Sequence, residues 1–359
     1  MCTKCIPSAI DEAKAGSFAD KFISDLNGAA NMLMISIGHR TGLFDAMSAV
    51  GAATSVALAR HAGLDERYVR EWLNAMTTGR VVEFDPASGE YVLPPEHAQW
   101  LTRGGTANLA GTAQWVTVLA SVEDRVTECF RKGGGVGYEH YNRFHEVMAE
   151  ETRMNVVRPL LDVLLPLVPE LRARLESGIR VLDLGCGVGE AITLLARKFP
   201  RSEFVGYDFY APAIAKARAS TAGLPNLRFE VRDAAAIDDT SAFDVVFTFD
   251  SVHDQAVPQR MLDNIHRALR PGGVHYMVDI GGQTAVEANM DWPLAPFMYA
   301  ISCMHCMSVS LAADGAGLGA MWGRQKAREM LDAAGFASVQ IHSLEHDIMN
   351  AYFINRKAA

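Results

Sequence analysis

Apolar side chains recur at helical spacing from Phe18 to Phe44 and predict one long helix. They form a broad, nearly continuous face made of Phe22, Ile23, Leu26, Ala29, Ala30, Leu33, Met34 and Ile37. Residues 1–16 show no such pattern, and we expect them to form a flexible tail. An exposed helix this apolar needs a covering partner, so we expect a second subunit to lie against it.

Shorter elements follow this helix. Two short helices, Ser55–Ala62 and Asp65–Thr78, are divided by a Gly-Leu pair, and Asp65 is placed to cap the second. The runs Val81–Phe84 and Glu90–Leu93 flank a Pro-Ala-Ser-Gly turn and predict a hairpin. Helices followed by a hairpin are typical of a winged helix-turn-helix domain, which we place at residues 17–105. Residues 106–175 predict further helices, interrupted by a glycine cluster at 133–137.

From residue 179 onward the pattern changes to strands that alternate with helices. The predicted strands are Arg180–Leu184, Glu203–Asp208, Arg228–Arg232, Asp244–Phe249, Val274–Ile280, Ser338–Leu344 and Ala351–Asn355. The predicted helices between them are Glu190–Phe199, Pro212–Thr221, Pro258–Leu269 and Gln325–Ala334. This alternation indicates the α/β class, with a mostly parallel sheet covered on both faces. Ligands bind such sheets beyond the carboxyl ends of the strands.

Charge and composition narrow the class of partner. The 359 residues include 33 Lys and Arg against 42 Asp and Glu, a net charge of -9. Because neither half of the chain is basic, we expect neither nucleic acid nor an anionic membrane as a partner. No apolar run reaches the roughly 18 residues of a spanning helix, and the first residues lack a signal-peptide core. Six cysteines are too few for a disulfide framework, so we expect a cytoplasmic protein.

A glycine-rich turn joins the first strand of this sheet to its helix. In the sequence VLDLGCGVGE the strand contains Asp183, and Gly185, Gly187 and Gly189 follow before the helix. Glycines allow a tight turn and let a ligand approach the backbone closely. The next strand ends at Asp208, about twenty residues on, where a carboxylate can accept hydrogen bonds from ribose hydroxyls. The third is followed by Asp233, which can accept from an adenine amino group.

The G-x-G-x-G spacing, together with Asp208 and Asp233, resembles the class I S-adenosylmethionine-dependent methyltransferases over about residues 150–359. The turn is acidic and has no lysine, which suits a cationic sulfonium ligand better than a pyrophosphate. The resemblance implies a Rossmann-like methyltransferase domain at residues 176–359. It also implies that S-adenosylmethionine is the cofactor. The residues expected to hold it are Asp183, Gly185, Cys186, Gly187, Gly189, Asp208, Phe209, Asp233, Ala234, Phe249 and Asp250.

The whole chain is similar to a mycobacterial-type group of winged-helix methyltransferases, related to plant-type small-molecule O-methyltransferases. The segments that carry this likeness are YNRFHEVMA (Tyr141–Ala149), SVHDQ (Ser251–Gln255) and MHCMSVSLAADGAGLG (Met304–Gly319). The resemblance implies a homodimer that acts on a small molecule. Its α-rich first domain would dimerise, and residues 106–175 would help to wall the substrate pocket. A transcription regulator with a vestigial methyltransferase domain is the alternative, but the helix DERYVREWLNAM lacks a basic footprint.

In the plant-type relatives the general base is the histidine of a His-Asp pair after the fourth strand. His253 falls on that position here, and Asp279, at the end of the fifth strand, is its expected acidic partner. Imidazole suits this task because its ordinary pKa lies near neutrality. The chain departs from the family at Gln255, where a tryptophan is usual, and it lacks the second acid before the last helix. His305 is a second catalytic candidate; either histidine could instead be structural.

Residues 281–323 lie where class I enzymes insert a helical lid over the substrate. This segment is rich in methionine and aromatic residues, which fits either an apolar pocket or the core of the lid. The expected substrate-binding residues are Tyr141, His145, Met298, Met304 and Trp322.

Two C-x-x-C pairs remain, Cys2 with Cys5 and Cys303 with Cys306. We expect no metal site. A weaker alternative has Cys303 and Cys306 binding a soft ion, because residues three apart share a helix face. In that case the reaction would be S-methylation of a thiol or a metalloid.

Overall fold

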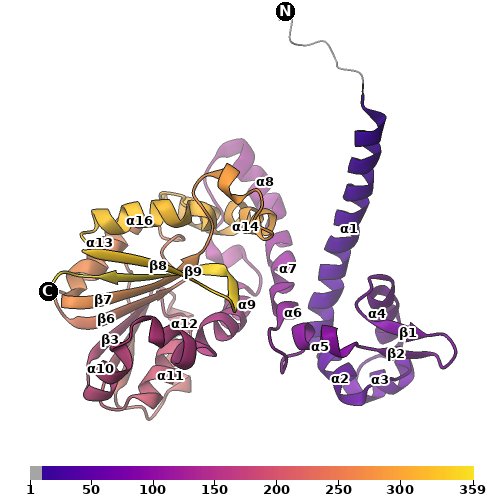
Figure 1. The fold of residues 1–359 in the computed structure, drawn as a ribbon, viewed down its shortest axis with the longest axis horizontal. Helices are drawn as coiled ribbons and strands as arrows, with labels where there is room; N and C mark the ends of the chain where they lie inside the picture. The colour runs from indigo at the N-terminus through magenta and orange to yellow at the C-terminus, as the bar shows by residue number, and fades with distance from the viewer. Residues whose placement is uncertain (1–9) are drawn as a thin grey trace, which may run out of the picture. The chain divides into compact units, whose positions relative to one another are not determined.

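The structure is a computed structural model that describes residues 10–359. The chain divides into two compact units, Met1–Thr117 and Val118–Ala359 (Figure 1). The division falls within helix α7 (Gln114–Ala120), so most of the segment 106–175 belongs with the second unit. Cys2 and Cys5 lie outside the described residues.

The first unit begins with α1 (Glu12–Thr41), the long helix that the apolar pattern predicts. Its N-cap residue Asp11 accepts hydrogen bonds from the backbone amides of Ala13 and Lys14, both at 3.1 Å. The flexible tail expected over residues 1–16 is therefore wrong for residues 12–16, which are helical because this cap starts the helix earlier. The helix ends at Gly42, which has a left-handed φ of 75°.

Short helices and a hairpin complete this unit. They are α2 (Leu43–Val50), α3 (Ser55–Ala62), α4 (Glu66–Thr78), β1 (Glu83–Asp85), β2 (Glu90–Val92), α5 (Pro95–Leu101) and α6 (Leu109–Thr112). In the core the Phe44 and Trp72 rings meet edge to face at 5.2 Å. The Trp72 indole donates to the Met34 carbonyl at 2.8 Å and so ties α4 to α1. Helices followed by a hairpin confirm the winged-helix pattern.

The second unit is built on a sheet with strand order β5-β4-β3-β6-β7-β9-β8. Its strands are β3 (Arg180–Leu184), β4 (Glu203–Asp208), β5 (Leu227–Val231), β6 (Phe243–Phe249), β7 (Leu269–Ile280), β8 (Ser338–Leu344) and β9 (Asp347–Arg356). All neighbouring pairs from β5 to β7 are parallel, whereas β9 runs antiparallel to both β7 and β8. The mostly parallel α/β sheet of the sequence prediction is confirmed.

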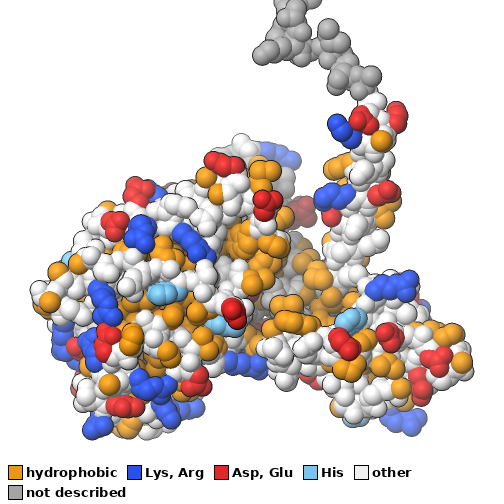
Figure 2. Space-filling view, in the orientation of Figure 1, with side chains coloured by type: hydrophobic (Ala, Val, Ile, Leu, Met, Phe, Trp, Pro, Cys, Tyr) orange, Lys and Arg blue, Asp and Glu red, His pale blue; other side chains and the backbone are white. Residues whose placement is uncertain are grey.

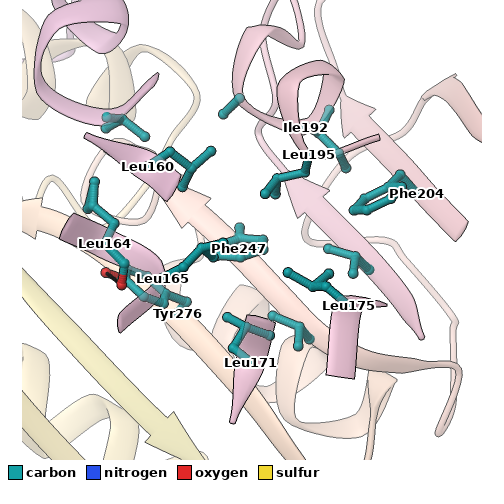
Figure 3. Packing of buried hydrophobic residues seen from close by; sticks show 14 of the residues in the cluster. Leu160, Leu164, Leu165, Leu171, Leu175, Ile192, Leu195, Phe204, Phe247 and Tyr276 are labelled. Atoms are coloured by element: carbon teal, nitrogen blue, oxygen red, sulfur yellow. Dashed lines mark hydrogen bonds between the residues drawn. The ribbon is translucent and has the colours of Figure 1, made fainter. Parts of the chain in front are cut away.

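Both faces of this sheet are buried, because successive side chains of a strand point to opposite faces. On one face Val181, Phe204 and Phe247 pack against η3 (Leu160–Leu164), α10 (Leu171–Ser177), α11 (Glu190–Lys198) and α12 (Ala211–Ser220) (Figure 3). On the other, Leu182 and Val246 pack against α13 (Pro258–Ala268) and α16 (Gly323–Ala333). A rigid sheet therefore fixes the strand ends that carry the site.

Helices also precede the sheet and make up the insertion that we expect to act as a lid. The preceding elements include α8 (Glu123–Lys132), η1 (Tyr138–His140), α9 (Phe144–Thr152), η2 (Arg153–Val157) and η4 (Leu165–Leu167). Those of the insertion are η5 (Val286–Asn289), α14 (Ala295–Ile301), η6 (Ser302–Cys306), α15 (Met307–Ala312) and η7 (Ala320–Trp322).

One stretch of the insertion corrects an expectation from the sequence. Residues Ala295–Ala312 are long and apolar enough to cross a membrane by length and composition, although we expected no such run. In the structure 44% of this stretch is buried inside the fold. Helices of a folded domain can meet the same length and composition criteria, so these criteria alone carry no argument for a membrane.

Candidate active site

The turn between β3 and α11 needs glycine for conformation and for space. Gly185, Gly187 and Gly189 all have left-handed φ angles, of 82°, 53° and 74°. A Cβ on Gly189 would lie 2.4 Å from the Phe229 ring, and one on Gly185 would lie 2.8 Å from Ser251 Cβ. A Cβ on Gly187 would have no heavy atom within 4 Å. The turn is therefore packed at its two ends and open in its middle.

Two carboxylates at neighbouring strand ends flank this turn. Asp208 accepts hydrogen bonds from the amides of Gly187 and Tyr210, both at 2.8 Å, and so holds the turn against the end of β4. Asp183 is buried, and its Oδ1 has no hydrogen-bond partner within residues 10–359. Burial, reinforced by the nearby Asp208 charge, raises the pKa of Asp183 to about 8. A bound cation would relieve this cost.

A pocket opens at these strand ends. It is lined by nine of the residues expected to bind the cofactor, which are Asp183, Gly185, Cys186, Gly187, Asp208, Phe209, Ala234, Phe249 and Asp250. Gly189 and Asp233 lie outside the lining. Asp233 is exposed and accepts a hydrogen bond from the Ala235 amide at 2.8 Å, so its expected contact with adenine stays a prediction.

Burial also acts on Asp250, which lines the pocket at the end of β6. Desolvation, followed by the nearby Asp279 charge, raises the pKa of Asp250 well above its usual value. This side of the pocket is therefore rich in carboxyl groups that are costly to ionise without a positive partner.

His253 lies between two carboxylates behind the pocket. Its Nδ1 is 2.7 Å from Asp279 Oδ1, and its Nε2 is 3.1 Å from Asp254 Oδ1. Asp279 also accepts hydrogen bonds from the Trp322 indole at 3.0 Å and from the Ile280 amide at 2.8 Å. The structure thus joins His253 to its expected partner, Asp279, and adds Asp254 on the other side.

The charge state of this group follows from its neighbours. Burial by itself lowers the pKa of His253, but the Asp279 and Asp254 carboxylates outweigh burial and raise that pKa well above its usual value. Conversely, His253 holds the pKa of Asp254 below its usual range despite burial. The two carboxylates therefore favour the protonated ring, and the pocket is lined by Asp254 rather than by His253.

His305, the second catalytic candidate, lies in an aromatic cage outside the pocket lining. Its ring stacks on Phe144 at 4.2 Å and meets Tyr141 edge to face at 4.7 Å. Burial lowers the pKa of His305 to about 4, so this ring is neutral at physiological pH.

Of the five residues expected to bind the substrate, one lines the pocket and the other four do not. His145 lines the pocket and stacks on Tyr210 at 4.3 Å. Tyr141 is buried and donates to the Met304 carbonyl at 2.6 Å, which ties the first helices of this unit to the lid. Met298 is buried in the lid, and Trp322 holds Asp279. Among the five, only His145 lines the pocket.

Sequence reasoning missed several residues of this site. Tyr138, Phe144 and Met148 line the pocket, and the Tyr138 hydroxyl donates to Asp254 Oδ2 at 2.9 Å. Phe144 and Met148 lie within the YNRFHEVMA segment, and Tyr138 precedes it by three positions, so that segment was a usable signal. No local pattern indicated that Tyr138 reaches Asp254.

Comparison with known proteins agrees with this geometry. Residues 29–103 match the family model for an Rv2258c-like winged HTH domain, and residues 175–335 match one for a methyltransferase domain. The trans-aconitate 2-methyltransferase of Deinococcus radiodurans is 39% identical over 95 residues, which are 26% of this chain and 35% of that protein. The chain thus spans about two fifths or less of the length of the first curated relatives that it matches.

Solved structures match over nearly the whole chain. A putative O-methyltransferase from Nostoc punctiforme has a TM-score of 0.71 at 19% identity, covering 94% of this chain and 98% of its own. Human N-acetylserotonin methyltransferase in complex with SAM has a TM-score of 0.65 at 15% identity, covering 99% and 100%. The chain therefore combines a winged helix-turn-helix domain with a class I methyltransferase domain, the architecture of S-adenosylmethionine-dependent methyltransferases.

Proposed function

We propose that this protein transfers the methyl group of S-adenosylmethionine to a hydroxyl group of a small molecule. The observation that carries the proposal is the pocket at the carboxyl ends of β3, β4 and β6, whose lining includes both buried carboxylates and aromatic side chains. Such a pocket holds a cation at one end and an apolar acceptor at the other.

The residues present fit the methyl donor, which supplies an electrophilic methyl group on a positively charged sulfur. Asp183 offers a buried carboxyl oxygen that lacks a hydrogen-bond partner within residues 10–359. The open space at Gly187 allows a ligand to approach the backbone, and Asp208 has acceptor capacity left for ribose hydroxyls. These three residues would hold the donor.

The acceptor side of the pocket is formed by Tyr138, Phe144, His145 and Met148. These side chains favour a flat, largely apolar small molecule. His253 is the proposed base, acting from behind Asp254 in its neutral form. Because its pKa is raised, the neutral form becomes more populated as pH rises, and positioning of the reactants supplies the rest of the rate.

The test is methyl transfer to a panel of small hydroxylated aromatic compounds, followed as S-adenosylhomocysteine formed. If His253 is the base, His253→Ala lowers kcat by about 10²- to 10⁴-fold and leaves donor affinity nearly unchanged. Wild-type turnover in this variant would exclude His253 as the base. Absence of donor binding in calorimetry would overturn the proposal as a whole.

We also propose that the protein is a homodimer joined through α1. Side chains on its first four turns remain exposed in the single chain, among them Phe18 at 68%, Phe22 at 60% and Leu26 at 61% (Figure 2). A row of large apolar side chains at this exposure is typical of a protein interface.

The charges on α4 argue against the alternative of a transcription regulator. Arg67 pairs with Glu71, and Arg70 lies 3.5 Å from Glu66, so each arginine there has an acidic partner one turn away. A DNA-reading helix needs unneutralised basic side chains.

We further propose a cytoplasmic location, because Cys129, Cys186, Cys303 and Cys306 are all free thiols.

A further inference from the structure

Three side chains with metal-binding atoms meet beside the pocket. His253, Asp254 and Cys306 each offer one such atom, and these atoms lie within 4.8 Å of one another. We propose that they form a zinc site, with His253 Nε2, one Asp254 oxygen and Cys306 Sγ as the ligands. Imidazole, carboxylate and thiolate are the ligand types that zinc takes in proteins.

The spacing of the first two ligands suits a tetrahedral ion. Zinc–nitrogen and zinc–oxygen bonds of about 2.0–2.2 Å at tetrahedral angles place two ligand atoms roughly 3.3–3.6 Å apart. His253 Nε2 and Asp254 Oδ1 are 3.1 Å apart. Cys306 lies in η6 of the lid, so the ion would join the lid to the loop after β6.

The surroundings hold these ligands as a metal site requires. Metal-binding histidines usually donate the second ring N–H to a carboxylate, and His253 Nδ1 lies 2.7 Å from Asp279. Asp279 is in turn held by the Trp322 indole at 3.0 Å. The second oxygen of Asp254 accepts from the Tyr138 hydroxyl at 2.9 Å, which leaves its first oxygen toward His253.

A general base alone does not account for this cluster. General-base action and zinc binding are alternative uses of one ring nitrogen, because His253 Nδ1 is occupied by Asp279 and Nε2 lies beside Asp254 and the Cys306 thiol. Binding of one ion by all three side chains would give the buried Cys306 thiol a function, as a metal ligand. With zinc on Nε2, the ion rather than His253 would activate the acceptor.

The site has a direct use in the proposed function. Asp254 lines the pocket, so a three-ligand zinc ion would keep its fourth position toward the acceptor. Zinc lowers the pKa of a bound hydroxyl or thiol. The acceptor class is therefore a small molecule that binds zinc through a thiolate or an alkoxide oxygen. This last step rests on the proposed methyl transfer, whereas zinc binding does not.

The experiment uses the full chain carrying Cys2→Ser and Cys5→Ser, which removes the other C-x-x-C pair. Metal-free protein is titrated with zinc in a calorimeter and with cobalt(II) in a spectrophotometer. We expect one ion per chain and the near-ultraviolet charge-transfer band of a thiolate–cobalt bond. Absence of either result in this protein overturns the site without recourse to any further variant.

Two further variants assign the ligands. Cys306→Ser should abolish the band and weaken zinc binding by more than about 100-fold, the upper range for loss of an outer-shell partner. Cys303→Ser, one turn away, is the matched control and should keep both. Asp279→Asn should keep the band and weaken zinc binding by about 10- to 100-fold.

A band that survives Cys306→Ser would overturn the assignment. Calorimetry with S-adenosylmethionine on the same preparation separates the two proposals. Donor binding and turnover without zinc binding would overturn the metal site alone, and zinc binding without donor binding would overturn the methyl transfer alone.

Discussion

Single carboxylates decide the character of the pocket. Asp183 and Asp208 lie at adjacent strand ends, and burial raises the pKa of both. Asp254 is the exception, because the His253 imidazolium keeps its pKa low despite burial. The pocket thus holds one carboxylate, Asp254, that favours the ionised form. Its other carboxyl groups ionise more easily when a cation lies beside them.

Asp208→Asn should weaken S-adenosylmethionine binding by about 1–3 kcal/mol. The amide cannot accept from both the Gly187 and Tyr210 backbone amides without turning an N–H group toward one of them. Isothermal titration calorimetry measures the change. Asp85→Asn, at an exposed carboxylate of the first unit that accepts from the Ala87 backbone amide, is the matched control. Unchanged affinity in Asp208→Asn would remove Asp208 from the donor site.

His253 should also make the stability of the fold depend on pH. Its folded pKa lies above the unfolded value of about 6.5, so its contribution is complete below that value. The contribution is lost as pH rises through the raised folded pKa. His253→Gln should therefore lower Tm most at mildly acidic pH and progressively less at alkaline pH. Thermal denaturation of both proteins in metal-free form across this range checks the trend; an equal loss at every pH would contradict it.

At the scale of elements, the β3–α11 turn combines two separate demands on glycine. All three of its glycines have left-handed φ angles, which disfavour any other residue. Only Gly185 and Gly189 are also in close contact with neighbouring side chains. Fold and ligand binding therefore depend on different positions of one short turn.

Gly187→Ala and Gly189→Ala should separate these demands. Both carry the left-handed penalty of about 1–2 kcal/mol, but only Gly189→Ala also forces a methyl group into the Phe229 ring. Gly189→Ala should thus lower Tm more, while Gly187→Ala should lose more donor affinity because its methyl group fills the open space. Denaturation and calorimetry on the pair measure both effects. An equal Tm loss would contradict the role assigned to Phe229.

At the scale of the molecule, each unit has its own core. The first packs around Phe44, Trp72 and Leu73, and the second packs on both faces of its sheet. The first half of α1 contributes to neither core, although it carries large apolar side chains. We attribute these side chains to assembly.

Phe22→Glu combined with Leu26→Glu should convert the proposed dimer into a monomer. The two carboxylates would have to be buried in an apolar interface, which is costly without partners. Light scattering coupled to size exclusion measures the mass. Ser17→Glu combined with Ser24→Glu adds the same charge on the opposite side of the helix and should leave the dimer intact. A monomeric wild-type protein at micromolar concentration would contradict the proposal.

The sequence by itself determined the elements and one edge of the site. The bounds predicted for β3, β4 and β8 agree with the structure, because strand periodicity is a local property. Asp183, Asp208 and Phe249 could be grouped in advance, since the carboxyl ends of parallel strands meet at the same edge of a sheet. In contrast, the start of α1 at Glu12 was missed, because the cap at Asp11 lies in a segment without apolar periodicity.

Only the tertiary structure decided what surrounds His253. The Tyr138 hydroxyl and Asp254 are 116 positions apart in the chain, and the Trp322 indole and Asp279 are 43 apart. Such contacts depend on how the lid and the first helices of this unit pack on the sheet, and no local pattern encodes that packing. The same packing brings Cys306 to His253 and Asp254 and places the histidine between two carboxylates. The charge of His253 is therefore a property of the folded chain, because burial and neighbouring charges set a pKa that residue type alone leaves open.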